Sequence, residues 1–355
     1  MRPVTTAALH RVASAPRPVP SAGGNTWAIL LAGGEGKRLS GLVERIHPDH
    51  RPKQYATIIG TRSMLQHTYA RALAHAAPGR VLAVITEGQE RWALSQLPEL
   101  PARNFLIQPR GLDTGPAVLF ALAHILEREP DALALLLPCD HFIFPEPDLR
   151  RPIAEALAAI RETETGAAVL LAARPTGPRC DVGWILPGET VRKTPSLLKR
   201  VLCFIEKPPR EVAESLLAEG ALWNTFIMAG RARGLHRLIE KRRPEAAERM
   251  ARYLALRRED AWRRELDQAY GKITPFNLSS QVLAREPEAL LVAPLGAVEW
   301  NDWGTPEGIQ ETLASLGWSH RSAVHPPEPF HAAAGECSVP PCMATAGAPE
   351  EEASP

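Results

Sequence analysis

The sequence predicts an α/β fold built on a doubly wound, mostly parallel sheet, with smaller insertions on one side. Two observations predict it. Short runs of four to seven residues, rich in Val, Ile and Leu, recur along the chain, and segments with helical spacing separate them. Runs of this length and composition are typical of strands buried on both faces. Their alternation with helices implies a parallel sheet that is covered on both sides.

The expected strands are Trp27–Leu31, Val81–Ile85, Asn104–Ile107, Ala132–Leu137, Ala167–Ala172, Val201–Ile205 and Leu290–Val292. Between two of them, four apolar residues spaced by 4, 4 and 3 positions run from Leu149 to Ile160 and form one stripe on a helix of about four turns. In such sheets, ligands bind beyond the carboxyl ends of the strands. The residues that follow each strand are therefore the candidates for chemistry.

The composition excludes several classes of protein. The 355 residues hold 41 Lys plus Arg against 40 Asp plus Glu, so no overall field attracts nucleic acid or an anionic membrane. Apolar runs such as Ala132–Pro138 are far shorter than the roughly 18 residues needed to cross a bilayer. The five cysteines form no C-x-x-C pair, so neither a disulfide framework nor a zinc site is expected. We expect a cytoplasmic protein without a nucleic-acid or membrane partner.

The two ends of the chain differ from its middle. Residues 1–25 and 319–355 are rich in proline and lack a hydrophobic period, so both are predicted to be disordered tails around one domain, 26–318. The acid-free N-terminal stretch leaves an organelle transit peptide open as the less favoured interpretation. The oligomeric state is not determined by the sequence, which is compatible with a homo-oligomer.

A glycine-rich loop follows the first expected strand. It contains Gly33, Gly34 and Gly36, followed by the cations Lys37 and Arg38. Glycines let backbone N–H groups surround a phosphate, and the cations supply the counter-charge. Leu31, Arg38 and Leu39 stand where a P-loop or a dinucleotide fingerprint would need other residues, so neither motif is present. A tight turn without a ligand remains the alternative.

Seven motifs in a fixed order make the sequence more specific. They are G-G-x-G-x-R-L at 33–39, R-P-K-Q at 51–54, Q-P at 108–109 with T-G-P-A at 114–117, P-C-D-H at 138–141, F-I-E-K-P at 204–208, W-N at 223–224 and W-N-D-W-G at 300–304. This series resembles the sugar-phosphate nucleotidyltransferases, and most of all the mannose-1-phosphate guanylyltransferases, whose P-K-Q and W-N motifs it shares. The resemblance covers essentially all of 26–318. It implies a Rossmann-like nucleotidyltransferase fold and transfer of a nucleotidyl group from an NTP to a sugar 1-phosphate, releasing pyrophosphate.

The resemblance implies two catalytic cations and a pair of metal ligands. It assigns Arg38 to the β- and γ-phosphates, Lys53 to the phosphates at the reacting centre, and Asp140 and Asp302 to Mg²⁺. Cations are needed because two unit negative charges 4 Å apart repel by about 4 kcal/mol at an effective dielectric of 20. Carboxylates suit Mg²⁺, although an aspartate at a strand end is otherwise a turn former or a cap. His141 is interpreted as structural, because an acceptor phosphate with a second pKa of about 6 needs no base.

The resemblance also distributes residues between the two substrates. It implies nucleotide contacts for Gly33, Gly34, Gly36, Gln108 and Gly115, and sugar-phosphate contacts for Gly183, Glu206, Lys207 and Asn224. Alternatives without a ligand remain. Thr114 and Gly115 also form a helix start, Trp184 and Trp223 could equally be core aromatics, and a Glu–Lys pair at a strand end is common on surfaces.

The most favoured reaction is GTP plus mannose 1-phosphate giving GDP-mannose, as in polysaccharide biosynthesis, with Mg²⁺ as the cofactor. Lys37, Asp113, Val182 and Trp184 depart from the residues usual in the family, which weakens any inference about the sugar. Uridylyl or thymidylyl transfer to another hexose 1-phosphate is therefore an alternative. A non-catalytic regulator that binds a sugar nucleotide is another, although it would have no need of the metal pair.

Overall fold

The computed structural model describes residues 24–162, 167–191, 198–256 and 261–318. The two predicted tails, 1–25 and 319–355, lie outside the described residues except for the two positions 24 and 25. No helix among the described residues is long and apolar enough to cross a membrane.

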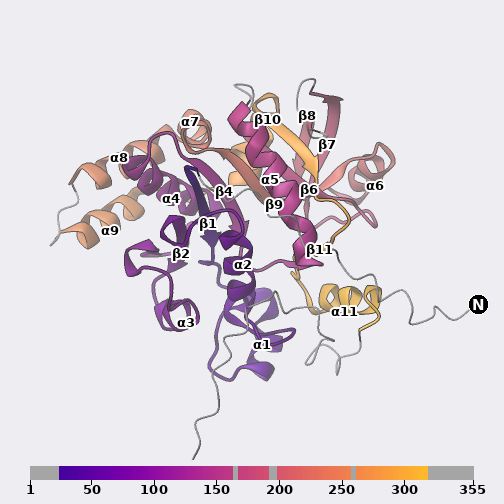
Figure 1. Ribbon diagram of the computed structural model, residues 1–355, viewed down its shortest axis with the longest axis horizontal. Helices are drawn as coiled ribbons and strands as arrows, with labels where there is room; N and C mark the ends of the chain where they lie inside the picture. The colour runs from indigo at the N-terminus through magenta and orange to yellow at the C-terminus, as the bar shows by residue number, and fades with distance from the viewer. Residues whose placement is uncertain (1–23, 163–166, 192–197, 257–260, 319–355) are drawn as a thin grey trace, which may run out of the picture.

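A nine-stranded sheet, in the order β3-β2-β1-β4-β9-β6-β10-β8-β7, organises the described chain (Figure 1). The strands are β1 Thr26–Leu31, β2 Val81–Thr86, β3 Phe105–Gln108, β4 Leu133–Pro138, β5 Phe142–Phe144, β6 Ala168–Ala173, β7 Gly183–Thr190, β8 Lys199–Glu206, β9 Leu222–Arg231, β10 Leu290–Pro294 and β11 Glu299–Asn301. Strands β3, β2, β1 and β4 are parallel, as is the pair β6 and β10. The predicted α/β fold and its expected strands are confirmed.

Four strands were not expected from the sequence. Strand β9 inserts antiparallel between β4 and β6, and β7 pairs antiparallel with both β8 and β9. The hydrophobic pattern does not predict β9, because polar residues interrupt this strand. Buried Thr225 donates from Oγ1 to the carbonyl of Leu171, beside a register shift in the pairing of β6 with β9. The short strands β5 and β11 form a separate antiparallel pair.

Helices cover both faces of the large sheet. They are α1 Ser40–Ile46, α2 Met64–Leu73, α3 Glu90–Gln96, α4 Thr114–Arg128, α5 Glu146–Glu162, α6 Arg210–Ala218, α7 Ala232–Arg242, α8 Pro244–Leu256, α9 Trp262–Lys272, α10 Leu278–Gln281 and α11 Pro306–Ser315. Because side chains alternate along a strand, Ala28 and Leu30 pack in the core that includes α2 and α5, while Trp27 and Ile29 pack in the core that includes α4 and α7. The stripe from Leu149 to Ile160 faces the first core, as predicted.

A third, smaller cluster brings the end of the domain to the glycine loop. Leu39 after the loop packs with Trp303 and with Ile309 of α11. The Trp303 ring also stacks on Phe142 with centroids 4.6 Å apart. In the β5–β11 pair, Asn301 lies opposite Phe142. This packing sets the segment that carries Asp302 beside the segment that carries Asp140.

Candidate active site

A cavity of about 590 Å³ opens at the carboxyl ends of β1, β3 and β4 and continues toward β7, β8 and β9. The residues proposed from the sequence that line it are Gly33, Gly34, Gly36, Arg38, Gln108, Asp140, Gly183, Glu206, Lys207, Asn224 and Asp302. Lys53 and Gly115 are not among its lining residues. The fold thus gathers segments from most of the chain around one space.

Side-chain donors occupy the carbonyl groups of the glycine loop. Gln54 donates from Nε2 to the carbonyls of Ala32 and Gly34, at 2.6 and 2.7 Å. Thr86 donates from Oγ1 to the Gly33 carbonyl at 2.9 Å. These contacts fix the course of the loop, and Gln54 and Thr86 are supporting residues whose roles the sequence did not reveal.

Two of the glycines lie close to neighbouring groups. A Cβ on Gly36, whose φ is +66°, would lie 2.8 Å from the backbone nitrogen of Lys53. A Cβ on Gly33 would lie 2.8 Å from Nε2 of Gln108. Gly36 therefore needs glycine, because its φ is positive and backbone occupies the space of a side chain, whereas a side chain at position 33 would displace the ends of Gln108 and Thr86.

Arg38 and Lys37 are placed differently although they are neighbours. The Arg38 side chain is 60% exposed, lines the cavity, and holds Nη2 3.8 Å from Oδ2 of Asp302. Lys37 is 84% exposed and forms an ion pair with Glu35. Only Arg38 of this pair is positioned to meet a phosphate in the cavity.

Lys53 is buried and braces the site, in that it links the segments that carry Asp140 and Asp302. Its side chain is 5% exposed, and Nζ donates to the carbonyls of Asp302 and Trp303, at 2.8 and 3.1 Å. Nζ also lies 3.1 Å from Oδ2 of Asp140. An ammonium has three donors, and these contacts use all of them. In this arrangement Lys53 joins the two aspartate segments from behind the cavity wall.

Asp140 and His141 follow β4. Burial alone would raise the pKa of Asp140, but the charges of Lys53 and His141 outweigh it and hold this pKa below its usual value. Burial lowers the pKa of His141, whose ring meets Trp300 edge-on at 5.4 Å. Nε2 of His141 is 3.6 Å from Oδ1 of Asp140. The geometry places the imidazole against the aspartate and the Trp300 ring, and the structural role of His141 stays a prediction.

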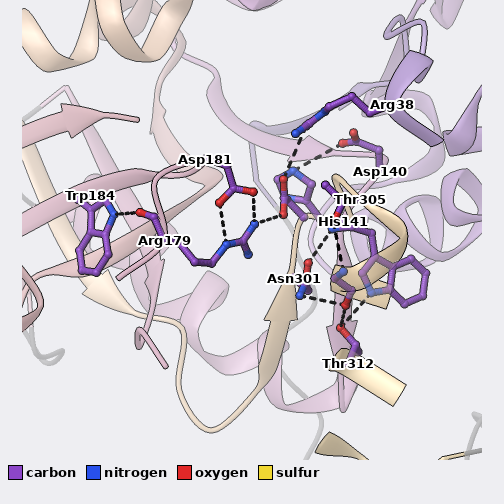
Figure 2. Close-up of polar contacts among 12 residues, drawn as sticks. Arg38, Asp140, His141, Arg179, Asp181, Trp184, Asn301, Thr305 and Thr312 are labelled. Carbon is purple, nitrogen blue, oxygen red and sulfur yellow. Dashed lines mark hydrogen bonds and ion pairs between the residues drawn. The ribbon is translucent and has the colours of Figure 1, made fainter. Parts of the chain in front are cut away.

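Arg179 is a functional candidate that sequence reasoning missed. Its guanidinium donates to both oxygens of Asp181, at 2.9 and 2.7 Å, and to Oδ1 of Asp302 at 2.7 Å (Figure 2). Asp181 is lowered in pKa chiefly by its hydrogen bonds to Arg179. The only local signal was an Arg and an Asp two positions apart before β7, which by itself is weak.

The expected nucleotide residues separate into two kinds. Gln108 is buried, and its Oε1 accepts from the Tyr270 hydroxyl at 3.1 Å. Gly115 lies at the start of α4, where its N–H donates to the Phe276 carbonyl at 3.0 Å and a Cβ would lie 2.1 Å from the Phe276 ring. Gly115 is therefore a packing glycine, and its neighbour Thr114 reaches the cavity wall instead.

The residues that the resemblance assigns to the sugar phosphate form one corner of the cavity, called the sugar-side corner for that expectation. A Cβ on Gly183 would lie 2.6 Å from Oε2 of Glu206 and 3.2 Å from Cβ of Asn224. Burial raises the pKa of Glu206, and its Oε2 has no hydrogen-bond partner among the described residues. Oδ1 of Asn224 accepts from the N–H of Phe226, which leaves its amide NH₂ as a donor. This corner therefore presents the Glu206 carboxylate as an acceptor and the Asn224 amide as a donor to the cavity.

Trp184 and Trp223 are core aromatics, one of the two alternatives weighed from the sequence. They are 0% and 4% exposed, and their rings meet edge-on. Nε1 of Trp184 donates to the carbonyl of Arg179 at 2.8 Å. Trp184 thus holds the loop that carries Arg179, and neither tryptophan is among the residues that line the cavity.

A family model described as nucleotidyl transferase matches residues 27–316. The chain belongs to the nucleotidyl transferase family. The matched residues include the glycine loop, both aspartates and the sugar-side corner, so the family covers the whole cavity. Enzymes of this family generally use a divalent metal ion.

Individual relatives have related names. The chain is 31% identical over 281 residues to "Xanthan biosynthesis protein XanB" of Xanthomonas campestris pv. campestris (strain B100), a match that covers 78% of this chain and 57% of that protein. It is 34% identical over 211 residues to "Mannose-1-phosphate guanylyltransferase" of Salmonella montevideo, covering 58% of this chain and 42% of the relative. The chain thus spans about half the length of these curated relatives.

A solved structure shares the fold. It is described as a mannose-1-phosphate geranyltransferase from Thermus thermophilus, and it superposes with a TM-score of 0.70 at 26% identity, covering 82% of this chain and 80% of the other. The structure of a UDP-glucose pyrophosphorylase in complex with UDP-glucose matches with a TM-score of 0.53 at 12% identity, covering 83% of this chain and 99% of the other, which supports the fold alone.

The two aspartates of this family member fit a metal that arrives with phosphates. No group of three or more His, Cys, Asp or Glu suited to a metal occurs among the described residues. Mg²⁺, however, is usually held by one or two carboxylates together with substrate phosphates. Asp140 and Asp302 both line the cavity, and both offer oxygen ligands. The donor set therefore suits Mg²⁺ bound jointly with a nucleotide.

Proposed function

We propose that this protein transfers a nucleotidyl group from GTP to mannose 1-phosphate, giving GDP-mannose and pyrophosphate. One observation carries the proposal: a single cavity joins the glycine loop, two carboxylates and a corner with hydrogen-bond donors and acceptors suited to a sugar. In the reaction, a phosphate oxygen of the sugar 1-phosphate forms a bond to the α-phosphorus. The bond from that phosphorus to the oxygen bridging to the β-phosphate breaks, and pyrophosphate leaves.

The residues of the chain would divide the work of bringing two anions together. Arg38 and the loop amides would bind the β- and γ-phosphates, and Lys207 would meet the phosphate of the sugar. Asp140 and Asp302 would hold Mg²⁺, which when bound neutralises charge that develops on the phosphates. Glu206 and Asn224 would bind sugar hydroxyls. No general base is required, because the attacking phosphate is already largely dianionic with a second pKa of about 6.

The orientation of Gln108 supports a base that presents a carbonyl group. Its Oε1 is engaged by the Tyr270 hydroxyl, so Nε2 is the group left to contact a base. An N–H donor in a buried position selects a base carbonyl, such as O6 of guanine or O4 of uracil or thymine, over the amino group of adenine, and among these bases we choose guanine. Relatives named as mannose-1-phosphate guanylyltransferases agree with this choice.

The test is pyrophosphate release across the four NTPs and a panel of hexose 1-phosphates, with Asp140→Asn as the inactive variant. The control is Arg151→Gln, which removes an exposed ion pair with Glu155 on α5. We expect turnover to be highest with GTP and mannose 1-phosphate and to be lost in Asp140→Asn alone. Faster turnover with UTP or dTTP would reassign the base. No turnover with any pair by folded protein would overturn the proposal and leave the binding regulator.

A further inference from the structure

Arg179 makes contacts that the proposed reaction does not yet use. It stands in the loop before β7, and one guanidinium joins two carboxylates: both oxygens of Asp181 and Oδ1 of Asp302 (Figure 2). The other oxygen of Asp302, Oδ2, is the one near Arg38 at 3.8 Å. The Asp302 carboxylate is therefore held by one oxygen and has the second directed toward a side chain of the cavity wall.

We propose that Arg179 is a positioning residue that orients the metal ligand Asp302, so that Oδ2 faces the cavity and accepts a divalent cation. The proposal rests on the nucleotidyl transfer proposed above. Partners outside the ligand sphere that orient metal ligands typically change metal affinity by about 10- to 100-fold when they are removed.

Arg179 acts through Asp302 and not by touching a substrate. Asp181 and Asp302 line the cavity, whereas Arg179 is not among its lining residues. The Arg179 side chain is 23% exposed, and that of Asp302 is 13% exposed. The guanidinium thus lies behind the two carboxylates that it joins.

Asp181 offsets the positive charge of Arg179 next to the proposed metal ligand Asp302. A cation hydrogen-bonded to a metal ligand would by itself repel the metal. Because Asp181 pairs with Arg179 through two oxygens, that pair is close to neutral, and Asp302 keeps its charge for the metal. Arginine suits this task since its planar fork of five donors can serve two carboxylates at fixed angles. A lysine carries the same charge without the fork.

Contacts with two tryptophans hold the Arg179 guanidinium in place without a ligand. The guanidinium carbon lies 5.4 Å from the centroid of the Trp223 ring, and the Arg179 carbonyl accepts from Nε1 of Trp184. Both tryptophans are buried. The guanidinium and the backbone of Arg179 are therefore held at separate points of the core. Little further ordering of the Arg179 side chain is needed when a metal binds.

Mn²⁺ binding tests the proposal by a readout other than turnover. Mn²⁺ is titrated into the wild type, Arg179→Gln, Arg179→Lys and Asp181→Asn, with and without GTP, and the bound ion is followed by electron paramagnetic resonance. Arg151→Gln is the matched control, since it removes an exposed arginine–carboxylate pair. The metal concentration for half-maximal pyrophosphate release and the KM for each substrate are measured in parallel, and thermal melts verify folding.

We expect Arg179→Gln and Arg179→Lys to weaken Mn²⁺ binding by about 10- to 100-fold while substrate KM values at saturating metal change less than about threefold. Asp181→Asn, which keeps the arginine but loses its neutral pairing, should also weaken binding. Unchanged or tighter Mn²⁺ binding in both Arg179 variants, wild-type affinity in Arg179→Lys, or no Mn²⁺ binding by the wild type would overturn the proposal. If the wild type binds Mn²⁺ and Arg179→Gln weakens it but no pyrophosphate is ever released, the positioning role stands and the proposed reaction fails.

Discussion

Replacing Lys53 by methionine tests whether this buried ammonium holds the two aspartate segments together. Methionine keeps a long unbranched side chain but removes the charge and all three donors. In the native protein those donors meet the carbonyls of Asp302 and Trp303 and the carboxylate of Asp140. The substitution therefore leaves two carbonyl acceptors without their partner at a position where Lys53 is 5% exposed.

The cost follows from these contacts. Each buried acceptor left unsatisfied costs about 1 to 3 kcal/mol. The ion pair adds less than about 1 kcal/mol, because the Asp140 side chain is 43% exposed and water can replace the ammonium there. Burial of the methionine side chain and relief from desolvating a charge offset part of the loss. We expect Lys53→Met to lower the free energy of unfolding by about 2 to 4 kcal/mol.

The assay is urea unfolding followed by circular dichroism, with Lys37→Met as the control. Lys37 is 84% exposed, so its replacement should change the free energy of unfolding by less than about 0.5 kcal/mol. Pyrophosphate release by folded Lys53→Met should fall by about 100-fold, since a shift of about 1 Å in Asp302 suffices for that. Stability of Lys53→Met equal to that of the control would refute the bracing role.

Two further substitutions test the packing and the charges of the fold. Gly115→Ala places a Cβ 2.1 Å from the Phe276 ring, and we expect a loss of about 1 to 3 kcal/mol by urea unfolding; unchanged stability would contradict the packing role. In the wild type, the charge of Arg71 outweighs burial and lowers the pKa of Glu146 from 4.5 to about 2. A lowered carboxyl pKa stabilises the fold above pH 4.5 and ceases to do so as the pH falls toward 2. Glu146→Gln should therefore cost about 2 to 3 kcal/mol at pH 7 and much less at pH 3, whereas an equal cost at both would exclude the charge as the cause.

Local patterns in the sequence predict most of the parallel half of the sheet. The burial of both faces of a strand makes it apolar throughout, so β1, β2 and β4 stand out as short runs of Val, Ile and Leu. Strand β9 does not stand out, because its polar Thr225 and Asn224 are buried through hydrogen bonds that no periodicity reveals. The antiparallel insertion therefore had to come from the structure.

In the candidate site, too, local sequence patterns predict some features and only the tertiary structure reveals others. The glycine loop and Asp140 follow directly from the order of residues after a strand, and both line the cavity. The position of Gly115 in a helix start is equally local, but its burial under Phe276, far along the chain, assigns it to packing. The neighbouring sequence determines that a residue follows a strand. Whether that residue is buried depends on segments far away in the chain.

The sequence by itself determined the α/β class, the strand ends at which the cavity opens, and the residue types that would suit phosphates and metal. Only the tertiary structure decided which of them meet. Lys53 reaches Asp302 across 249 positions, and Arg179 reaches the same residue across 123. Periodicity within an element decides only which of its faces is buried. Contacts over such separations arise when the β5–β11 pair and the Trp303 cluster pack, and this packing turns scattered charges into one site.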